Sequence, residues 1–573
     1  MRIGIFVCHC SLNVSATIDV EQVIREVTEY PGVVYVEAYE DLCLDPALER
    51  IKKSAAEKGL EAVVMTTCSP TTHQQCLRDA MTAVGLPPDY AQVVDIRYDH
   101  ETMETATRKA IDLLKATVDD LWAKAPPATF SLSPIKRALI IGGGIAGIRA
   151  ALDIADGGYE VILVEKTSSI GGHMIQLSET FPTLDCPQCI ETPWMVDTGQ
   201  HPNIKMLAYS EVEKVSGCIG NFRVKIRRKA AYVDWDKCNG CGMCMQKCLT
   251  SVPAEFDRYI NFGQRKAIYK PFAQAVPNKV VIDREHCGHF TTGLCSVCEK
   301  ICPNEAIDYS QQDSFMEVEV GAIVVATGYE LLPKGEIREF EEDPDIIDGL
   351  QFERILCPSG PTDGVILRPS DGKVAKEVVF ISCVGSRDPE HGLPYCSRVC
   401  CMYSVKMAML YKHAVHDGQA YIFYMDIRVT GKGYEEFVQR AVEENGVLYL
   451  RGRVSKVFRD GDKIKVWGVD TLTGKRVEIS CDLVVLATAM IPSPGAKELA
   501  SKLGIATDEY GFMAEIHPKL RPLESAVPGI YLAGTATGPK DIPDAVAQAS
   551  GAASKVLALF SKDELILEKV AAS

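Results

Sequence analysis

Eight of the 22 cysteines in this 573-residue chain fall into two closely spaced runs. The first run has the spacing C-x2-C-x2-C-x3-C, and the second run ends in C-x2-C-x3-C-P. Cysteines at this spacing hold iron–sulfur cubanes, with three ligands from one run and the fourth from the other. The spacing therefore predicts two cubanes with crossed ligand sets. The first set is Cys238, Cys241, Cys244 and Cys302, and the second is Cys287, Cys295, Cys298 and Cys248.

Two other chemistries use closely spaced cysteines, namely structural zinc sites and disulfide frameworks. Structural zinc sites usually present two separated C-x2-C pairs, unlike these runs. A chain of 62.7 kDa can bury its own core without disulfides, and no apolar signal peptide follows Met1 and Arg2. We therefore expect reduced cysteines that ligate clusters, in a cytoplasmic compartment.

Composition excludes several classes of protein. The formal net charge is −16 and the pI is about 5.3, so no basic stripe is available to bind nucleic acid. No apolar run approaches the roughly 20 residues that span a bilayer. Hydrophobic residues make up 47% of the chain and charged residues 24%, which is typical of a globular protein of about two to four domains.

A dinucleotide-binding pattern begins after a proline-containing linker at 123–134. The apolar segment 137–141 predicts a buried strand, which runs into G-x-G-x-x-G at Gly142, Gly144 and Gly147 and then into a helix at 148–155. The next predicted strand ends on Glu165, at about the offset where a carboxylate binds the ribose of a dinucleotide. We expect the pyrophosphate at the N-terminus of the helix, where free amides and the helix dipole favour anions.

Three later segments favour FAD rather than NAD at this site. Predicted strands end in Ala-Thr-Gly at 326–328 and in Ala-Thr-Ala at 487–489, and a strand at 529–535 leads into a helix that begins near Asp544. These segments, in this order, are typical of flavoproteins with two dinucleotide-binding domains. The residues expected at the cofactor are Gly142, Gly144, Gly147, Glu165, Lys166, Gly172, Ala326, Thr327, Gly328, Gly534, Thr535, Asp544 and Ala545. His173 follows Gly171 and Gly172 and could approach the flavin or its phosphates, but we expect a surface histidine whose hydrogen bonds are satisfied.

The second glycine-rich turn of such flavoproteins, which binds NAD(P)H, is missing. The corresponding strand opens onto Cys383, and Cys396, Cys400 and Cys401 follow. This C-x12-C-x3-C-C set is compatible with a further cubane, and also with a buried thiol beside a redox-active disulfide.

Two further groups of cysteines remain open to more than one interpretation. Cys186 and Cys189 form a C-x2-C pair, which is either a redox-active dithiol or a structural element near the flavin. Predicted parallel strands at 3–7 and 62–66 end in cysteines at the sheet edge where α/β domains place their sites. The candidate ligands of a cluster there are Cys8, Cys10, Cys43 and Cys68, with Cys76 as a substitute for one of them. Buried thiols without a cluster fit this spacing equally well.

The order of these motifs resembles HdrA, the iron–sulfur flavoprotein of heterodisulfide reductase, along essentially the whole chain. The residues that carry the resemblance are Cys8-His9-Cys10, Cys68-Ser69-Pro70, the glycines from Gly142 to Gly147, Phe181-Pro182 through Cys186 and Cys189, the two cysteine runs, and Val399-Cys400-Cys401-Met402. The resemblance implies an α/β fold with a thioredoxin-reductase-like FAD-binding (Rossmann-type) core, an N-terminal α/β cluster domain and an inserted two-cluster ferredoxin domain. It also implies that Cys383, Cys396, Cys400 and Cys401 hold a cluster near FAD. Lys406 is implied to lie near the flavin N5, and we add Cys186 and Cys189 as candidate catalytic residues.

The resemblance further implies flavin-based electron bifurcation within a complex of several proteins. Its expected partners are an HdrB-like protein that reduces a disulfide, an HdrC-like protein that resembles ferredoxin, ferredoxin itself, a second copy of this chain, and an electron-input module. That module is a hydrogenase, a formate dehydrogenase or an NADH-linked unit with an MvhD-like linker. One feature departs from the methanogen form, which has an additional two-cluster ferredoxin domain at its C-terminus, because no cysteine follows Cys481 here. Another protein of the complex is expected to supply that branch, or the circuit differs.

The motifs divide the chain into seven predicted segments. They are an N-terminal α/β iron–sulfur domain (1–122), a linker (123–134), three parts of the FAD-binding domain (135–233, 312–357 and 482–573), the inserted ferredoxin domain (234–311), and a degenerate nicotinamide-type domain with a cluster (358–481). Three functions compete: a bifurcating flavoprotein, a non-bifurcating electron conduit in sulfur metabolism or ring reduction, and a stand-alone NAD(P)H-dependent disulfide reductase. The missing glycine-rich turn counts against the third.

Overall fold

The computed structural model describes residues 1–9, 14, 16–40, 42, 45–67, 70–96, 102–123, 129–391 and 393–568. The chain divides into two compact units. The N-terminal unit comprises Met1–Ser133, Ile516–Pro522 and Glu564–Ser573, and the large unit comprises Pro134–Glu515 and Leu523–Asp563. In the part of the chain that the structure describes, no helix combines the length and the apolar character that a membrane span requires.

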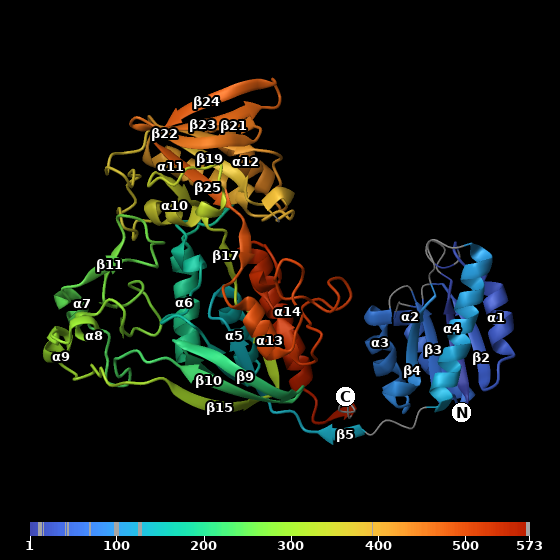
Figure 1. The fold of residues 1–573 in the computed structure, drawn as a ribbon. Helices are drawn as coiled ribbons and strands as arrows, with labels where there is room; N and C mark the ends of the chain where they lie inside the picture. The colour runs from blue at the N-terminus through green and yellow to red at the C-terminus, as the bar shows by residue number, and fades with distance from the viewer. Residues whose placement is uncertain are drawn as a thin grey trace. The chain divides into compact units, whose positions relative to one another are not determined.

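A four-stranded parallel sheet forms the centre of the N-terminal unit, with the strand order β2-β1-β3-β4. Both β1 and β3 are buried along their whole length, because helices cover both faces of the sheet (Figure 1). Helices α1 and α4 pack on one face, and α2 and α3 pack on the other. The strands are β1 (Ile3–Cys8), β2 (Val33–Tyr39), β3 (Ala62–Thr67) and β4 (Ala91–Asp95), and the helices are α1 (Val20–Thr28), α2 (Asp45–Lys58), α3 (Pro70–Thr82) and α4 (Met103–Ala123). A short antiparallel ribbon of β5 (Thr129–Leu132) and β28 (Leu565–Glu568) also belongs to this unit.

The large unit contains a five-stranded parallel sheet, which we call the first sheet, with the order β27-β16-β6-β7-β8. Its strands come from three distant parts of the chain, namely β6 (Arg137–Ile141), β7 (Glu160–Val164), β8 (Ile204–Leu207), β16 (Ala322–Val325) and β27 (Ile530–Leu532). Helices α5 (Ile145–Asp156) and α14 (Ile542–Phe560) pack together beside it. An antiparallel sheet packs against it through a shared apolar core and consists of β9 (Ser210–Cys218), β10 (Asn221–Arg228) and β15 (Ser314–Val320). The glycine-rich strand-to-helix prediction is confirmed, although α5 begins three residues before the predicted helix.

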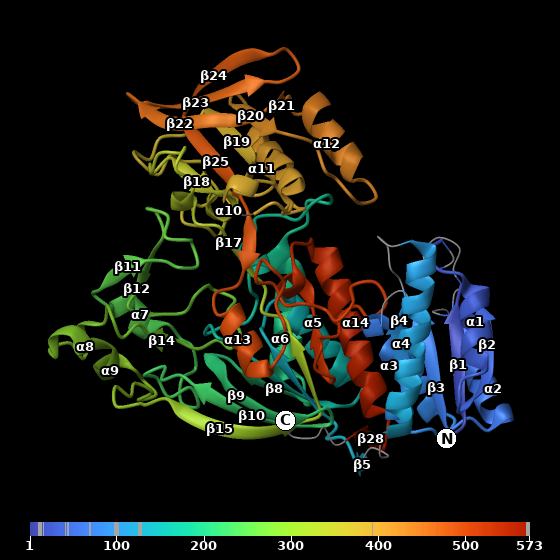
Figure 2. The same ribbon diagram turned by 45° about the vertical axis from the view of Figure 1, so that its right-hand side comes forward.

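The second sheet repeats this architecture, with the order β18-β25-β19-β20-β21. Its parallel strands are β18 (Ile346–Asp348), β25 (Leu483–Thr488), β19 (Glu377–Val384), β20 (Gln419–Tyr424) and β21 (Leu448–Arg451). Helices α10 (Gly349–Leu356), α11 (Cys400–Ala414) and α12 (Tyr434–Glu443) share an apolar core with one face. The other face packs against the antiparallel strands β22 (Val454–Asp460), β23 (Lys463–Asp470) and β24 (Lys475–Cys481), which lie at the top of Figure 2. The ribbon of β17 (Tyr329–Leu331) and β26 (Met490–Pro492) connects two parts of the large unit. The part around the first sheet is the FAD-binding half, and the part around the second sheet is the second half.

The second sheet extends past the predicted boundaries at 358 and 481. Strand β25 was assigned to the FAD-binding domain because it ends in Ala-Thr-Ala, but its register partners are β18 and β19 of the second sheet. A buried apolar strand that ends in small residues suits either dinucleotide-binding sheet, so the sequence pattern alone does not decide between them.

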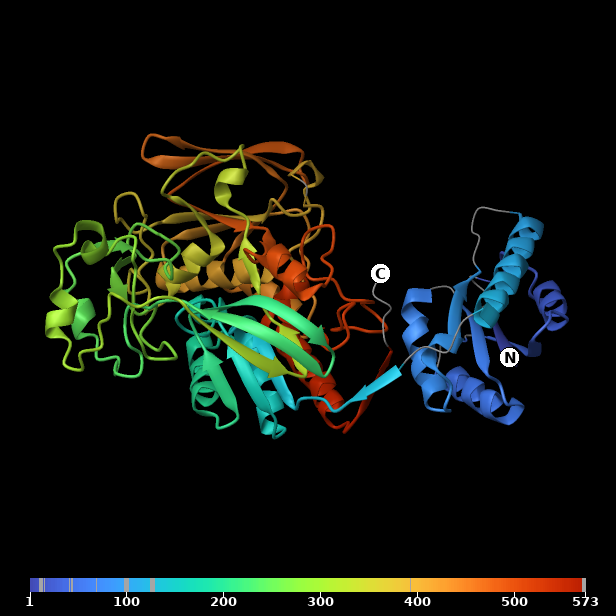
Figure 3. The ribbon, with the colours of Figure 1, turned by 60° about the horizontal axis from the view of Figure 1, so that its bottom comes forward.

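Residues 234–311, which we call the insert, form a small lobe (green in Figure 3) with little regular structure. It contains two short antiparallel ribbons and three helical turns. These are β11 (Ser251–Pro253) with β12 (Gln264–Lys266), β13 (Ile268–Tyr269) with β14 (Val281–Ile282), α7 (Met243–Lys247), α8 (Gly288–Thr292) and α9 (Val297–Ile301). Cysteines take part in its core, since Cys238, Cys244, Cys287 and Cys298 are buried there.

Candidate functional site

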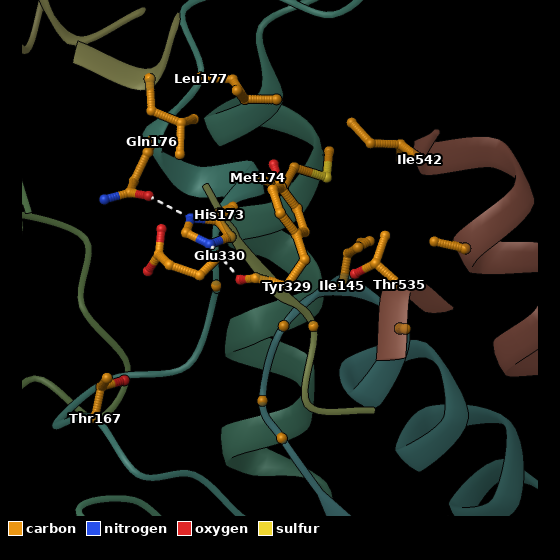
Figure 4. Close-up of a pocket in the computed structure, with 18 of the residues that line it drawn as sticks. Ile145, Thr167, His173, Met174, Gln176, Leu177, Tyr329, Glu330, Thr535 and Ile542 are labelled. Carbon is orange, nitrogen blue, oxygen red and sulfur yellow. Dashed lines mark hydrogen bonds between the residues drawn. The ribbon is translucent and has the colours of Figure 1, made fainter. Parts of the chain in front are cut away.

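A cavity of about 800 Å³ lies in the large unit, where the first sheet, the second half and the insert meet (Figure 4). It opens at the carboxyl ends of β6, β7 and β16 and at the N-termini of α5 and α14, which contribute Gly142, Glu165, Thr327, Ile145 and Ile542 to its wall. This is the edge where α/β sheets bind their ligands, and the volume suits a large organic cofactor.

The glycine-rich turn after β6 allows backbone to approach backbone closely. Gly142 has φ +108°, and a Cβ there would lie 2.4 Å from the carbonyl oxygen of Ala326. A Cβ on Gly147 would lie 1.8 Å from the carbonyl oxygen of Gly142. Gly144 is the N-cap of α5 and has no side chain to cover the first amides of the helix. The turn therefore leaves an uncovered helix N-terminus at the cavity, which is suited to a pyrophosphate.

Glu165, which follows β7, is held in a fixed position by three hydrogen bonds. The Gly143 amide donates to Oε2 at 2.7 Å, and the Thr167 amide and hydroxyl donate to Oε1 at 2.7 and 2.8 Å. A carboxylate has about four acceptor positions, so one remains for a sugar hydroxyl in the cavity. Lys166 lies beside it in the wall.

The later predicted cofactor residues divide into two groups. Gly172, Ala326, Thr327, Gly328, Thr535 and Ala545 line the cavity, as do Gly142, Gly144, Glu165 and Lys166. The Thr327 hydroxyl oxygen is buried and has no hydrogen-bond partner among the described residues, so it is available to a ligand.

Three of the predicted cofactor residues, Gly147, Gly534 and Asp544, are not in the cavity wall. The Asp544 carboxylate instead accepts from Arg398 at 2.9 Å, and its amide donates to Asp541. Asp544 lies in the first turn of α14 and its side chain pairs with Arg398, so its contact with the cofactor stays a prediction. A Cβ on Gly534 would lie 2.8 Å from that of Ala146, so this glycine serves helix packing.

Lys406 lines the cavity from α11 and is 1% exposed. Its Nζ forms an ion pair with Glu353 of α10 and donates to the Glu179 carbonyl oxygen at 2.8 Å. The Ser178 hydroxyl donates to the other oxygen of Glu353 at 2.6 Å. The buried charge is therefore compensated, which a buried ammonium group requires.

Sequence reasoning missed the part of the wall that the insert contributes. Arg265 lies 3.8 Å above the ring of Tyr269 and donates to Asp283 at 2.8 Å. Phe256 and Phe272 pack with ring centroids 4.8 Å apart. The wall residues from the insert are Ala254, Glu255, Phe256, Arg265, Tyr269, Pro271 and Phe272. No spacing rule marks them, because they lie in irregular chain between the two cysteine runs.

His173 also belongs to this wall and is half-buried rather than a surface residue. Its Nδ1 lies 2.8 Å from the Gln176 side-chain oxygen, and its Nε2 lies 3.0 Å from the Tyr329 carbonyl oxygen (Figure 4). Both ring nitrogens are thus engaged, as expected, and the imidazole fixes the position of two neighbouring wall segments.

Three cysteines meet beside the cavity in the second half. Cys383 is the penultimate residue of β19 and has φ +60°, Cys400 and Cys401 begin α11, and the three pack together with Ala487 and Tyr403. A hydrogen bond with Cys400 lowers the pKa of Cys383, and hydrogen bonding to both neighbours raises that of Cys400 well above its usual value. The Cys400 hydrogen bond also lowers the pKa of Cys401 to about 7.

Cys396, the fourth member of the predicted set, lies outside this buried group. It is half-buried, and the backbone amide of Arg398 donates to its Sγ at 3.3 Å. The structure therefore brings together three of the four predicted ligands.

The insert brings together the four cysteines of the first predicted crossed set, whereas the second set stays a prediction. A small apolar cavity is lined by Cys238, Cys241, Cys244 and Cys302, with Pro303. Cys287 and Cys298 are buried in the same core, which Cys248 flanks, and the Cys298 Sγ lies 3.0 Å from the Tyr309 hydroxyl. Within the described residues, no three His, Cys, Asp or Glu side chains are grouped as for a single metal ion. A cubane distributes its ligands over four irons, so these wider groups fit a cluster better than one ion.

The remaining candidate cysteines are only partly described. Cys8 ends β1 and is buried, whereas Cys76 is exposed on α3. Cys10, Cys43 and Cys68 lie outside the described residues, so the N-terminal ligand set stays a prediction. Cys186 and Cys189 form an exposed disulfide at the N-terminus of α6 (Pro187–Gln200), whose Ile190 lines the flavin-sized cavity.

Comparison with known proteins gives a consistent result. A family model for an FAD binding domain matches residues 137–179, and one for pyridine nucleotide-disulphide oxidoreductases matches 404–550. The HdrA protein of the H(2):CoB-CoM heterodisulfide,ferredoxin reductase of Methanothermobacter marburgensis is 44% identical over 100% of this chain and 87% of its own length. An iron-sulfur HdrA protein of the CoB–CoM heterodisulfide reductase of Methanopyrus kandleri is 45% identical with the same coverage. Thioredoxin reductase of T. acidophilum is similar in structure, with 16% identity, a TM-score of 0.41, and coverage of 74% of this chain and 99% of that one.

The glycine-rich turn, the cavity beside it and the repeated sheets, together with the two family models, identify a flavoprotein oxidoreductase with an FAD-binding domain. Identity above 40% along the whole chain is more specific than the fold. The chain belongs to the HdrA family of heterodisulfide reductases.

We expect Gly147→Ala to abolish FAD binding, because the new Cβ would overlap the Gly142 carbonyl oxygen and displace the turn that faces the pyrophosphate. Such overpacking costs about 1–3 kcal/mol of stability or more. Flavin absorbance per chain and the urea midpoint measure the two effects. Gly158→Ala is the control for destabilisation away from the site: its φ of +88° strains an alanine, so the urea midpoint should fall, but nothing lies within 4 Å of the new Cβ and FAD should be retained. Full flavin content in Gly147→Ala would contradict the assignment.

Proposed function

We propose that this chain is the FAD- and iron–sulfur-carrying component of a heterodisulfide-reductase-type complex and that it divides electrons between two branches by flavin-based bifurcation. The observation that supports this most directly is the position of α11. Its first turn carries Cys400 and Cys401, and Val399, Tyr403 and Lys406 of the same segment line the cavity. One rigid helix thus holds both a redox-capable cysteine group and the wall of the flavin site.

Bound FAD would supply a group that takes up two electrons together and gives them out singly. The chain's own residues bind and orient it. The N-terminus of α5 holds the pyrophosphate, Glu165 accepts from the ribose hydroxyls, and the unpartnered Thr327 hydroxyl donates to the ligand. The aromatic wall from the insert excludes water from the cavity.

Lys406 would act at the reactive end of the cofactor, as the family resemblance implies. An ammonium group has three N–H donors, and Glu353 and the Glu179 carbonyl use two of them. The third is free to hydrogen-bond a ring nitrogen or oxygen in the cavity. Glu353 keeps the charge in place by compensating it.

We assign cluster ligands from the cysteine groups. The insert would hold two cubanes with the crossed sets, and Cys383, Cys400, Cys401 and Cys396 would hold a third. For Cys396 this needs a rearrangement of its loop when the cluster is present. Cys8, Cys10, Cys43 and Cys68 would hold a fourth. Cys186 and Cys189 would serve as a dithiol relay, since their disulfide is exposed and adjoins a cavity residue.

The names of the relatives suggest the wider circuit. One couples H(2) to CoB–CoM heterodisulfide and ferredoxin, another adds formate, and a third uses ferredoxin or F(420)H(2). We extend this to a cytoplasmic complex with an electron-input module, an HdrC-like protein and an HdrB-like protein that reduces the disulfide. A non-bifurcating conduit would use the same cavity and cysteines.

Coupling of the two branches separates bifurcation from simple conduction. In the native complex, purified without oxygen, we expect ferredoxin reduction to stop when the disulfide acceptor is omitted, because neither branch then discharges alone. Spectrophotometry of ferredoxin with and without the acceptor measures this. Ferredoxin reduction at an unchanged rate without the acceptor would favour the conduit.

The purified chain alone should not be reduced by NADH or NADPH. Helix α11 begins at Cys400, well after β19 ends at Val384, so no tight turn presents a helix N-terminus to a second pyrophosphate. Anaerobic mixing with either nucleotide, followed by flavin absorbance, tests this. Rapid bleaching would restore the stand-alone disulfide reductase as the better function.

Cys400→Ala should remove one cluster and leave the others. The parent should hold about four cubanes, roughly 16 irons, and the variant about four irons fewer, because it lacks a buried ligand. FAD should remain bound. Iron analysis and low-temperature magnetic resonance measure both, and Cys357→Ala, which removes a buried thiol outside every ligand set, is the control. An unchanged iron content in Cys400→Ala would mean that these cysteines are thiols and do not ligate a cluster.

A further inference from the structure

Buried hydrogen-bond donors without partners lie around the Cys383, Cys400 and Cys401 group. The side chains of Ser386 and Ser404 are 0% and 1% exposed, and neither hydroxyl has a partner among the described residues. The Nη1 atom of Arg387 is buried and unpartnered in the same way. Folded proteins rarely leave such groups unsatisfied, so an acceptor that these residues do not supply is expected here.

The three donors belong to the two elements that carry the cysteines. Ser386 and Arg387 follow the turn after β19, where the Ser386 amide donates to the Cys383 carbonyl oxygen at 3.3 Å. Ser404 lies one turn after Cys400 on α11 and so on the same side of the helix. Unpartnered donors thus occur on both of the elements that carry the cysteines.

Asp426 fixes the guanidinium group of Arg387. Its carboxylate accepts from Nη2 of Arg387 at 2.8 Å, and its carbonyl oxygen lies 3.7 Å from the Cys401 Sγ. Because Asp426 contacts both Arg387 and Cys401, the buried Nη1 donor of Arg387 is held in the neighbourhood of the cysteines.

We propose that Arg387, Ser386 and Ser404 donate hydrogen bonds to the sulfur atoms of the cluster held at Cys383, Cys400 and Cys401, and thereby raise its reduction potential. This inference rests on the proposed cluster at that site. Reduction adds one electron and breaks no bond, so the sulfurs become more negative. Donors and a cation beside them stabilise the reduced form more than the oxidised form. The cluster next to the flavin is therefore tuned as an electron acceptor.

Arg387→Gln in the full-length chain tests the inference, with anaerobic redox titration followed by low-temperature magnetic resonance. The signal that Cys400→Ala removes should titrate at a more negative potential, with an equilibrium constant for one-electron reduction about tenfold lower, or about 59 mV. Iron and FAD content should not change. Ser404→Ala should shift the same signal in the same direction by less, and Arg387→Lys should lie between the parent and Arg387→Gln, since it keeps the charge but not the planar donors.

Arg451→Gln is the matched control. Arg451 also pairs with Asp426, at 3.4 Å, but its side chain is 45% exposed. The same loss of charge there should leave the reduction potential of the proposed cluster unchanged. A parent-like midpoint in Arg387→Gln with full iron content overturns the inference. If Arg387→Gln loses iron, Ser386→Ala with Ser404→Ala takes its place, and a parent-like midpoint in that variant overturns it equally. If the parent has no signal that depends on Cys400, the proposed cluster fails instead.

Discussion

The buried ion pair between Lys406 and Glu353 joins the parts of the large unit on which the candidate site depends. Lys406 comes from α11 and Glu353 from α10, and Ser178 and Glu179 of the FAD-binding half complete their hydrogen bonds. Removal of one partner of such a pair leaves an uncompensated buried charge, at a cost of about 3–5 kcal/mol. The next residue, Arg354, is also fully buried and donates to Asp257 of the insert at 2.9 Å. Two consecutive residues of α10 therefore connect the second half to both other parts of the cavity wall.

The chain accommodates the insert without disturbing this arrangement because of where the insertion occurs. Strands β10 and β15 pair directly in register, with Arg228 opposite Ser314, so the insert leaves and re-enters the core at neighbouring positions. An exposed hairpin connection of this kind tolerates inserted domains. The insert then returns to the cavity through Phe256 and Phe272, so a domain that is separate in sequence becomes part of the flavin site.

Local patterns predicted those features that local physics determines. The glycines of the 142–147 turn follow from close backbone approach, and the grouping of Cys238, Cys241 and Cys244 with Cys302 follows from the cysteine spacing that is typical of a cubane site. Contacts between distant segments were not predictable in this way. The pairing of Asp544 with Arg398, the transfer of β25 to the second sheet and the contribution of the insert to the cavity all depend on tertiary packing. Cys396 belongs to the predicted set by spacing, yet spacing does not determine the path of the loop that carries it.

The positions of the cysteine groups do not determine the reduction potentials of the clusters proposed there. The group at Cys383 and the group in the insert differ in the hydrogen-bond donors that lie near them. Within residues 234–311, all of which the structure describes, no buried side-chain donor is without a partner, so protein groups already use the donors there. Beside Cys383, buried donors remain for a cluster. Because hydrogen bonds to sulfur raise the reduction potential, these side-chain donors would raise the potential of the cluster proposed beside Cys383. The proposed flavin would then have neighbouring clusters of unequal potential, and such an inequality is what the proposed two-branched flavoprotein requires and a uniform conduit does not.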